Sequence, residues 1–182
     1  LTFVAPRMIL VGGSDDERRV RRDFSKRVVL ISGNSSDLSQ TLVKKHSESQ
    51  GNKSIFLDTG FPGFLGDALL TASVERVRPE QWYPNLLLFF DQIDCAFNSE
   101  TEIAMHPKHV GRDHSKFFGS RKLYGGQTMN VVSNSALVIA THSTSISYAV
   151  LFTKPLILVT CDAIESSSQR RKFEIRNCGI ET

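Results

Sequence analysis

The stretch 136-ALVIATHSTSISYAVLFTKPLILVT-160 sets the class of fold that we expect for this chain. Its first part, residues 136–144, is typical of a buried strand that ends in small polar residues. Residues 145–154 have the apolar spacing of a helix, and residues 155–160 form a second apolar run that starts at a proline. Strands that lack polar alternation and are separated by a helix indicate a parallel sheet.

The sequence before this stretch continues the same alternation from about residue 54. The predicted elements are a strand at 54–58, an amphipathic helix at 79–100, a strand at 101–107, a loop and short strand at 115–126, and a short helix at 127–135 with Thr128 as its N-cap. We therefore expect an α/β fold, a Rossmann-like parallel sheet with helices on both faces.

The first fifty residues are more strongly charged. Residues 2–11 predict a strand, which leads into a turn and a charged surface segment. The basic run at 18–26 is typical of a solvated face, and residues 27–32 predict a second buried strand. Residues 33–49 carry loop, N-cap and short-helix signals.

Composition places the chain among ordinary globular proteins. It has 182 residues, a formal net charge of +3 and a pI of about 8.9, which fits an anionic ligand or a membrane surface but is too weak to indicate nucleic acid. Its three cysteines are odd in number and widely spaced, which argues against a disulfide framework and a zinc site. No apolar run is long enough to span a membrane, and residues 1–12 lack the features of a signal peptide.

Three polar groups follow the last apolar residue of a predicted strand. They are Asp58, His106 and the cluster Thr141–Ser145. The carboxyl ends of parallel strands meet at one edge of a sheet, and that edge is where open α/β sheets bind ligands. We therefore expect one site there.

The hydroxyl cluster suggests an anion site. A helix N-terminus presents unpaired N–H groups and a positive dipole end, and short hydroxyls beside it add donors for a phosphate. The alternative is simple N-capping by Ser143 or Ser145. One hydroxyl suffices for a cap, so four of them at Thr141, Ser143, Thr144 and Ser145 favour phosphate binding.

The other candidate residues have two interpretations each. His106 can donate a hydrogen bond to a phosphoryl oxygen or protonate it, or it can be a surface histidine. Asp58 can act as a general base or cap the following turn, and these two roles stay open. The glycine-rich turn at 124–128 would allow a nucleotide to approach closely.

Two further kinds of site are disfavoured. His109, Asp113 and His114 have irregular spacing in a predicted loop, which argues against a metal centre, and no Asp-x-Asp motif is present to hold a divalent ion against a diphosphate. A hydrolase triad of Ser143, His106 and Asp58 lacks the G-x-S-x-G elbow.

Residues 27–160 resemble the C-terminal, donor-binding half of bacterial GT-B glycosyltransferases of capsular and surface polysaccharide biosynthesis. The chain is also similar to bacterial sialyltransferases and CDP-glycerol-type polymer transferases, which share an Asp motif, a His-Pro motif and a Ser-Ser/Thr motif in this order. The resemblance is carried by IFLDTGFPGFLGD, QWYPNLLLFFDQID, IAMHPK and KFFGSRKLYGGQTMNVVSNSALVIATHSTSISYAVLFTKPLILVT.

This resemblance implies an enzyme that transfers a sugar from a nucleotide-sugar donor to a polysaccharide or lipid-linked glycan acceptor, without a metal or other cofactor and without nucleic acid. Residues 1–50 would be the end of an N-terminal acceptor domain and its linker, and residues 51–182 the nucleotide-sugar-binding domain. The chain would then be a fragment. A cytoplasmic location is implied, with peripheral contact at the inner membrane left open.

The resemblance also assigns site residues. Asp58 and His106 would be catalytic. The donor phosphate would be bound by His106, Lys108, Ser143, Thr144 and Ser145, and the base or ribose by Gly125, Gly126, Gln127 and Thr128. Two departures stand out, because Thr59 replaces the second acidic residue of the sialyltransferase motif and Thr141-His142 precedes Ser143 where the polymer transferases often have Asp. Alternative functions are a sialyltransferase using CMP-sialic acid, a non-catalytic nucleotide-binding module and a UDP-sugar epimerase.

Overall fold

The chain forms two compact units. A computed structural model divides it into residues 1–45 and residues 46–182. The structure describes residues 7–24, 28–43, 51–62, 78–109, 115–141 and 143–160.

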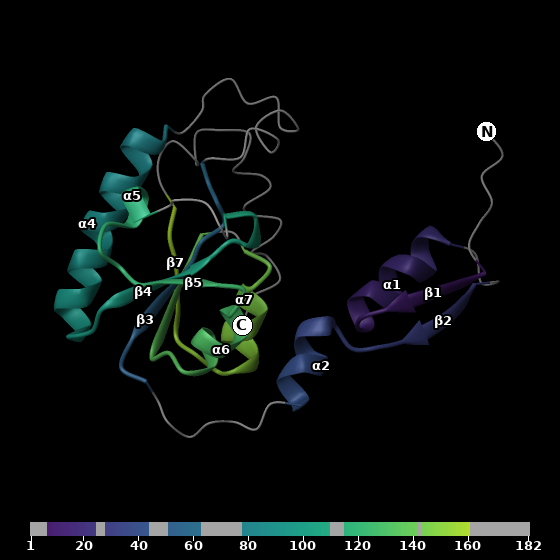
Figure 1. Cartoon of the computed structure of the whole chain (residues 1–182). Coiled ribbons are helices and arrows are strands. Elements are labelled where there is room, and N and C mark those ends of the chain that lie inside the picture. The colour runs from purple at the N-terminus through teal and green to yellow at the C-terminus, as the bar shows by residue number, and fades with distance from the viewer. Residues whose placement is uncertain are drawn as a thin grey trace. The chain divides into compact units, whose positions relative to one another are not determined.

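The N-terminal unit is built around a pair of parallel strands (Figure 1). Its elements are β1 (Met8–Val11), α1 (Ser14–Asp23), β2 (Val29–Ser32) and α2 (Ser36–Val43). β1 pairs with β2 so that Met8 lies beside Val29 and Leu10 beside Ile31. Within the described residues, the predictions of a strand in 2–11, a strand in 27–32 and a short helix in 33–49 are therefore confirmed, while residues 2–6, 27 and 44–49 lie outside them.

Helix α1 was not expected from the sequence. The prediction of a charged surface segment is correct for its exposure, since α1 buries no residue, but wrong for its conformation. Charge order explains the helix, because Asp15, Asp16 and Glu17 lie in the first turn and Arg21 and Arg22 in the last, where each sign favours the helix dipole. Arg21 also bonds Glu17 one turn before it, at 2.8 Å.

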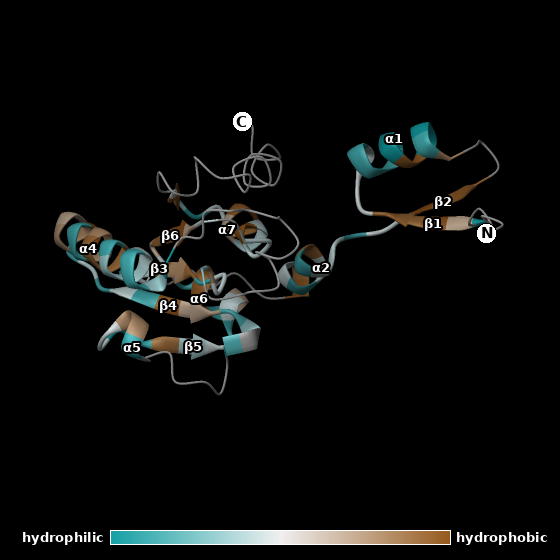
Figure 2. Cartoon of the chain, turned by 90° about the horizontal axis from the view of Figure 1, so that it is seen from above, coloured by the Kyte–Doolittle hydropathy of each residue, from teal (hydrophilic) through white to brown (hydrophobic). Residues whose placement is uncertain are grey.

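Strand β2 is not buried, which corrects the sequence prediction for residues 27–32. Val29 is 58 % exposed and Ile31 46 %, and Met8 and Leu10 beside them are 63 % and 70 % exposed. These four side chains lie on one face, because the strands pair in register. Figure 2 shows both strands as apolar and α1 as mainly hydrophilic. An apolar strand sequence predicts a sheet face, and whether that face is covered depends on what packs against it.

The C-terminal unit contains a five-stranded sheet in the order β5-β4-β3-β6-β7, with every neighbouring pair parallel. In this order β3 is central, and Leu57 at its end lies beside Ala104 and Ala140. The strands are β3 (Ser54–Leu57), β4 (Thr101–Met105), β5 (Leu123–Gly125), β6 (Leu137–Ala140) and β7 (Leu156–Leu158). The expected α/β fold with a Rossmann-like parallel sheet is confirmed.

Helices cover both faces of this sheet (Figure 1). Strand residues alternate between the faces, so Phe56 packs with α4 and α5, whereas Ile55 and Leu57 pack with α6 and α7. The bounds are α4 (Pro79–Phe97), the 3-10 turn η1 (Pro107–His109), α5 (Ser115–Phe118), α6 (Thr128–Ser133) and α7 (Ile146–Leu151). Among the described residues, no helix is long and apolar enough to cross a membrane.

Helix α4 anchors one face of the core, as its sequence spacing predicts. It begins with Pro79, a residue suited to a first helical position, and its C-cap is Asn98, whose φ of 47° is left-handed. Phe90 is fully buried, and its ring lies 5.0 Å from that of Phe56. Burial of such a side chain contributes about 2–3 kcal/mol. Phe97, which has the same apolar character, is 58 % exposed at the end of the helix.

Some element boundaries differ from those expected. The strand predicted at 101–107 ends at Met105 and is followed by η1, and a short helix α5 lies in the predicted loop before β5. Gln127, not Thr128, is the N-cap of α6, and its side chain makes no capping hydrogen bond. Thr128 is instead the first residue of that helix, so its predicted capping role is wrong.

An ionic network holds the amino-terminal end of β4. Asp94 of α4 accepts hydrogen bonds from the backbone N–H of Thr101 at 2.7 Å and from the Arg121 guanidinium at 2.6 Å. Arg121 also bonds the carbonyl of Thr101 at 3.1 Å and the carboxylate of Asp91 at 2.6 Å. The Arg121 side chain is only 11 % exposed, so this network ties α4, β4 and the start of β5 together.

Candidate functional site

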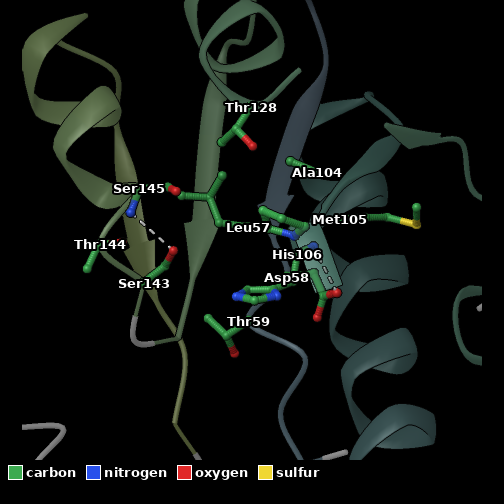
Figure 3. A pocket seen from close by; sticks show the side chains of 11 residues that line it. Leu57, Asp58, Thr59, Ala104, Met105, His106, Thr128, Ser143, Thr144 and Ser145 are labelled. Atoms are coloured by element: carbon green, nitrogen blue, oxygen red, sulfur yellow. Dashed lines mark hydrogen bonds between the residues drawn. The ribbon is translucent and has the colours of Figure 1, made fainter. Parts of the chain in front are cut away.

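A pocket of about 240 Å³ opens at the carboxyl ends of β3, β4 and β6. It lies where the central strand β3 separates the half of the sheet with β4 and β5 from the half with β6 and β7. In a doubly wound sheet this is the switch point, the usual place for a ligand. The pocket is lined by Leu57, Asp58, Thr59, Ala104, Met105, His106, Pro107, Thr128, Ser143, Thr144 and Ser145 (Figure 3).

The pocket brings together most of the residues singled out in the sequence. Those that line it are Asp58, His106, Thr128, Ser143, Thr144 and Ser145. Gly125, Gly126 and Gln127 are not among its lining residues. The side chain of Lys108 and the whole of His142 lie outside the described residues, so their predicted places stay predictions.

His106 forms one wall of the pocket, directly after β4. Its backbone is held at both polar groups, because its N–H donates to Asp58 Oδ2 at 3.3 Å and its carbonyl accepts from the N–H of His109 at 2.8 Å. Pro107 follows and begins η1. Figure 3 shows the His106 imidazole projecting from this strand end towards the side of the pocket that carries Ser143.

The opposite wall contains the hydroxyl cluster between β6 and α7. Ser145 is the N-cap of α7 by backbone position, but its side chain makes no capping hydrogen bond. Ser143 Oγ accepts the N–H of Ser145 at 3.2 Å, which leaves its own O–H proton to be donated elsewhere. Thr144 is exposed beside them. Ser143 thus stabilises the turn before α7, and Ser143, Thr144 and Ser145 all line the pocket.

Thr141 belongs to the interior and not to the pocket wall. It is fully buried, and its hydroxyl lies 3.4 Å from that of Thr59. This contact joins the loop after β6 to the loop after β3. The count of four hydroxyls in the sequence therefore overstates the number that can face a ligand.

Asp58 lines the pocket, and both oxygens of its carboxylate have hydrogen-bond partners. Its side chain is 2 % exposed. Oδ1 accepts the N–H of Gly60 at 2.8 Å, an Asx-turn that uses the left-handed φ of 74° at that glycine. Oδ2 accepts the N–H of His106 and lies 3.0 Å from His109 Nδ1. The turn-capping role that the sequence left open is thus present in the structure.

Burial and the nearby Asp58 carboxylate act on a tyrosine of α4. Both raise the pKa of Tyr83 well above its ordinary value, with burial the larger cause. An anionic phenol would be poorly solvated there and would lie close to a second negative charge. Tyr83 therefore stays neutral and contributes its ring, which stacks on Phe117 at 4.4 Å.

Two residues of the site were missed by the functional interpretation of the sequence. Thr59 lines the pocket, and His109, whose side chain is 4 % exposed, contacts the lining residue Asp58. The spacing of His109, three residues after His106, fits one turn of the helix η1 that follows β4. No group of three or more metal-binding side chains occurs among the described residues, which do not include Asp113 and His114.

The side chains at the pocket offer mainly hydrogen-bond donors. Hydroxyls on one wall face an imidazole on the other, and Asp58 is the sole carboxylate among the described lining residues. No family model matches the sequence, and a search of curated proteins finds no match either. We therefore infer the function from the pocket itself.

Proposed function

We propose that the C-terminal unit binds a nucleotide-sugar through its phosphate and is the donor-binding part of a GT-B glycosyltransferase. One observation carries this proposal: His106 and the Ser143 and Ser145 hydroxyls converge from separate strands on one pocket at the switch point of a parallel sheet. The acceptor would be a surface or capsular polysaccharide or a lipid-linked glycan.

The donor set suits a phosphate that leaves with the nucleotide. Charge grows on the leaving phosphate as the glycosidic bond breaks, and fixed donors near that oxygen stabilise the transition state. His106 would donate a hydrogen bond to the phosphoryl oxygen, or a proton if it is cationic. The serines would hold the remaining oxygens from the opposite wall. No metal is required in this scheme.

The size of the pocket limits what it holds. Its volume of about 240 Å³ is below the roughly 300–1,000 Å³ common for sites that enclose a small molecule. We therefore place the phosphate in the pocket and the rest of the donor outside it. Thr128 lies at the pocket and follows the exposed residues Gly126 and Gln127, so the base or ribose would lie along that turn.

The test is a thermal-shift and calorimetry screen of the 182-residue chain with CMP, CDP, UDP, GDP and inorganic phosphate. We expect one nucleotide to raise the melting temperature selectively. CMP would point to a sialyltransferase, and UDP or GDP to a hexosyltransferase. Absence of binding to all five by a folded chain would overturn the proposed donor site.

His106→Ala provides the sharpest variant for this site. It should weaken binding of the selected nucleotide by about 1–3 kcal/mol, the range for a hydrogen bond to a charged group. Urea unfolding should change little, because the side chain is only half-buried and faces the pocket. Wild-type affinity in a folded His106→Ala protein would contradict the assignment.

A second candidate function is a nucleotide-binding module without catalysis. The observation that favours it is the engagement of Asp58, since the one described carboxylate that lines the pocket is 2 % exposed and already accepts hydrogen bonds. Transfer or hydrolysis of the nucleotide-sugar selected by the screen would exclude this alternative. Tight binding of the donor without turnover, in the presence of acceptor glycans, would support it.

A further inference from the structure

A buried histidine–carboxylate pair adjoins the pocket through Asp58, which is one of the lining residues. His109 Nδ1 is 3.0 Å from Asp58 Oδ2, and the two side chains are 4 % and 2 % exposed. A carboxylate can only accept hydrogen bonds, so Nδ1 of His109 carries the proton between them. Separating the two side chains would leave a buried donor and a buried acceptor without a hydrogen bond, which is costly in free energy. This cost holds the two side chains together.

The pair holds the backbone of one pocket residue from two sides. Asp58 Oδ2 accepts the N–H of His106, and the backbone N–H of His109 donates to the carbonyl of His106 at 2.8 Å. The His106 and His109 rings lie 6.1 Å apart in an edge-on arrangement. Both polar backbone groups of His106 are therefore fixed by the same two residues.

The same carboxylate also fixes the loop after β3. Asp58 Oδ1 accepts the N–H of Gly60, and the N–H of Asp58 donates to the carbonyl of Ala104 at 3.0 Å. The carboxylate thus joins the ends of β3 and β4. A base that removes a proton from an acceptor must reach that acceptor, and a carboxylate with 2 % exposure and both oxygens bonded is poorly placed for this.

Resting on the proposed function, we infer that Asp58 and His109 are positioning residues that fix the His106 imidazole at the phosphate, and that Asp58 is not the general base of the reaction. Asp58 acts through the backbone of His106, and His109 orients Asp58. Neither needs to touch the donor.

The side chain of Asn places an N–H donor near the position of Nδ1 in histidine, whereas that of Leu places none. His109→Asn should therefore keep the His106 imidazole in place and retain most of the nucleotide affinity, whereas His109→Leu should weaken that affinity. Asp58→Asn replaces one of the two accepting oxygens with an NH2 donor, so the side chain can no longer accept from Gly60 on one side and from His106 and His109 on the other. Asp94→Asn is the matched control, because Asp94 also accepts a backbone N–H and a side-chain donor but lies at the opposite end of β4.

The first readout uses ligand-free protein and NMR of labelled histidine side chains. We expect Asp58→Asn and His109→Leu to move the His106 ring resonances, while His109→Asn and Asp94→Asn leave them in place. Circular dichroism checks that each variant is folded. If Asp58→Asn does not fold, the His109 pair of variants still decides the question. Equal His106 resonances in His109→Asn and His109→Leu would overturn the inference.

The second readout is affinity for the nucleotide selected by the wild-type protein. Asp58→Asn and His109→Leu should each weaken it by about tenfold, the equivalent of one hydrogen bond, and the two controls should not. Unchanged affinity in Asp58→Asn would overturn positioning. A wild-type chain that binds no nucleotide would defeat the proposed function, while the ligand-free spectra would still test whether the pair holds His106.

Discussion

At each end of strand β4, a carboxylate from another part of the chain accepts a backbone N–H, yet the surroundings of the two carboxylates differ. At the amino end, Asp94 faces the Arg121 guanidinium and receives two bonds from Thr101. At the carboxyl end, Asp58 faces His109 and backbone N–H groups beside a pocket. The amino end pairs full opposite charges and holds elements together. At the carboxyl end of β4, hydrogen-bond donors lie around the pocket.

The largest expected effect comes from a substitution at the amino end of β4. Asp94→Ala leaves Arg121 without one carboxylate partner and should lower the free energy of unfolding by about 3 kcal/mol, as for removal of one member of a largely buried pair. Urea denaturation measures this. Nucleotide affinity should stay unchanged in the folded protein, and a parallel loss of affinity would show that the two ends are coupled.

In contrast to Asp94→Ala, the double variant Ser143→Ala/Ser145→Ala should reduce nucleotide affinity and not stability. We expect nucleotide binding to weaken by about 1–3 kcal/mol, because donors to a charged phosphate are removed. Ser147→Ala is the matched control, since its hydroxyl donates to the Thr144 carbonyl and does not line the pocket. If the two serines only stabilise the turn, thermal stability would fall and affinity would not.

A pH titration tests the surroundings of Asp58, at the carboxyl end of β4, through their effect on the pKa of Tyr83. The pKa of Tyr83 is raised by burial and by Asp58, so its contribution to stability is complete below about pH 10 and is lost as pH rises further. The wild-type unfolding free energy should fall more steeply above that pH than that of Tyr83→Phe, by at most about 1.4 kcal/mol per pH unit. Urea titrations at several alkaline pH values measure the two slopes. Parallel slopes would mean that Tyr83 ionises alike in folded and unfolded chains.

The smallest effect concerns an exposed ion pair near the amino end. Lys53 and Glu100 lie 3.1 Å apart, with side chains 39 % and 53 % exposed. Lys53→Ala should change the free energy of unfolding by less than about 1 kcal/mol, in contrast to Asp94→Ala. Urea denaturation of the two variants side by side makes the comparison. A loss as large as that of Asp94→Ala would show that burial does not set the difference.

Much of the C-terminal fold follows from apolar patterning alone. The strands at β3, β4, β6 and β7 and the long helix α4 were all expected, because buried parallel strands lack alternation and α4 has helical apolar spacing. Helix α1 was missed, since charge order and not apolar spacing sustains it. The exposure of Val29 was also missed, because a sequence does not say what packs over a sheet face.

The candidate site was predictable only in part. Asp58, His106 and Ser143 were found because polar residues that follow parallel strands meet at one edge. The role of His109 could not be predicted, because the sequence does not distinguish a histidine buried against a carboxylate from a histidine on the surface. Thr141 shows the reverse error, since it belongs to the hydroxyl cluster but lies in the interior.

The position of β3 at the centre of the sheet has a consequence for how the protein is made. Ser54 of β3 pairs on one side with Thr101 of β4 and on the other with Leu137 of β6. The strand of this sheet that is synthesised first can therefore complete its pairing only after two much later strands have been made. Contacts of such high sequence separation slow folding. The two walls of the pocket, His106 and Ser143, flank this strand from separate crossovers. A nascent chain that ends before β6 would therefore leave one edge of the apolar strand β3 unpaired and would lack the pocket wall that carries Ser143. We expect such a chain to need protection from aggregation until β6 has been synthesised.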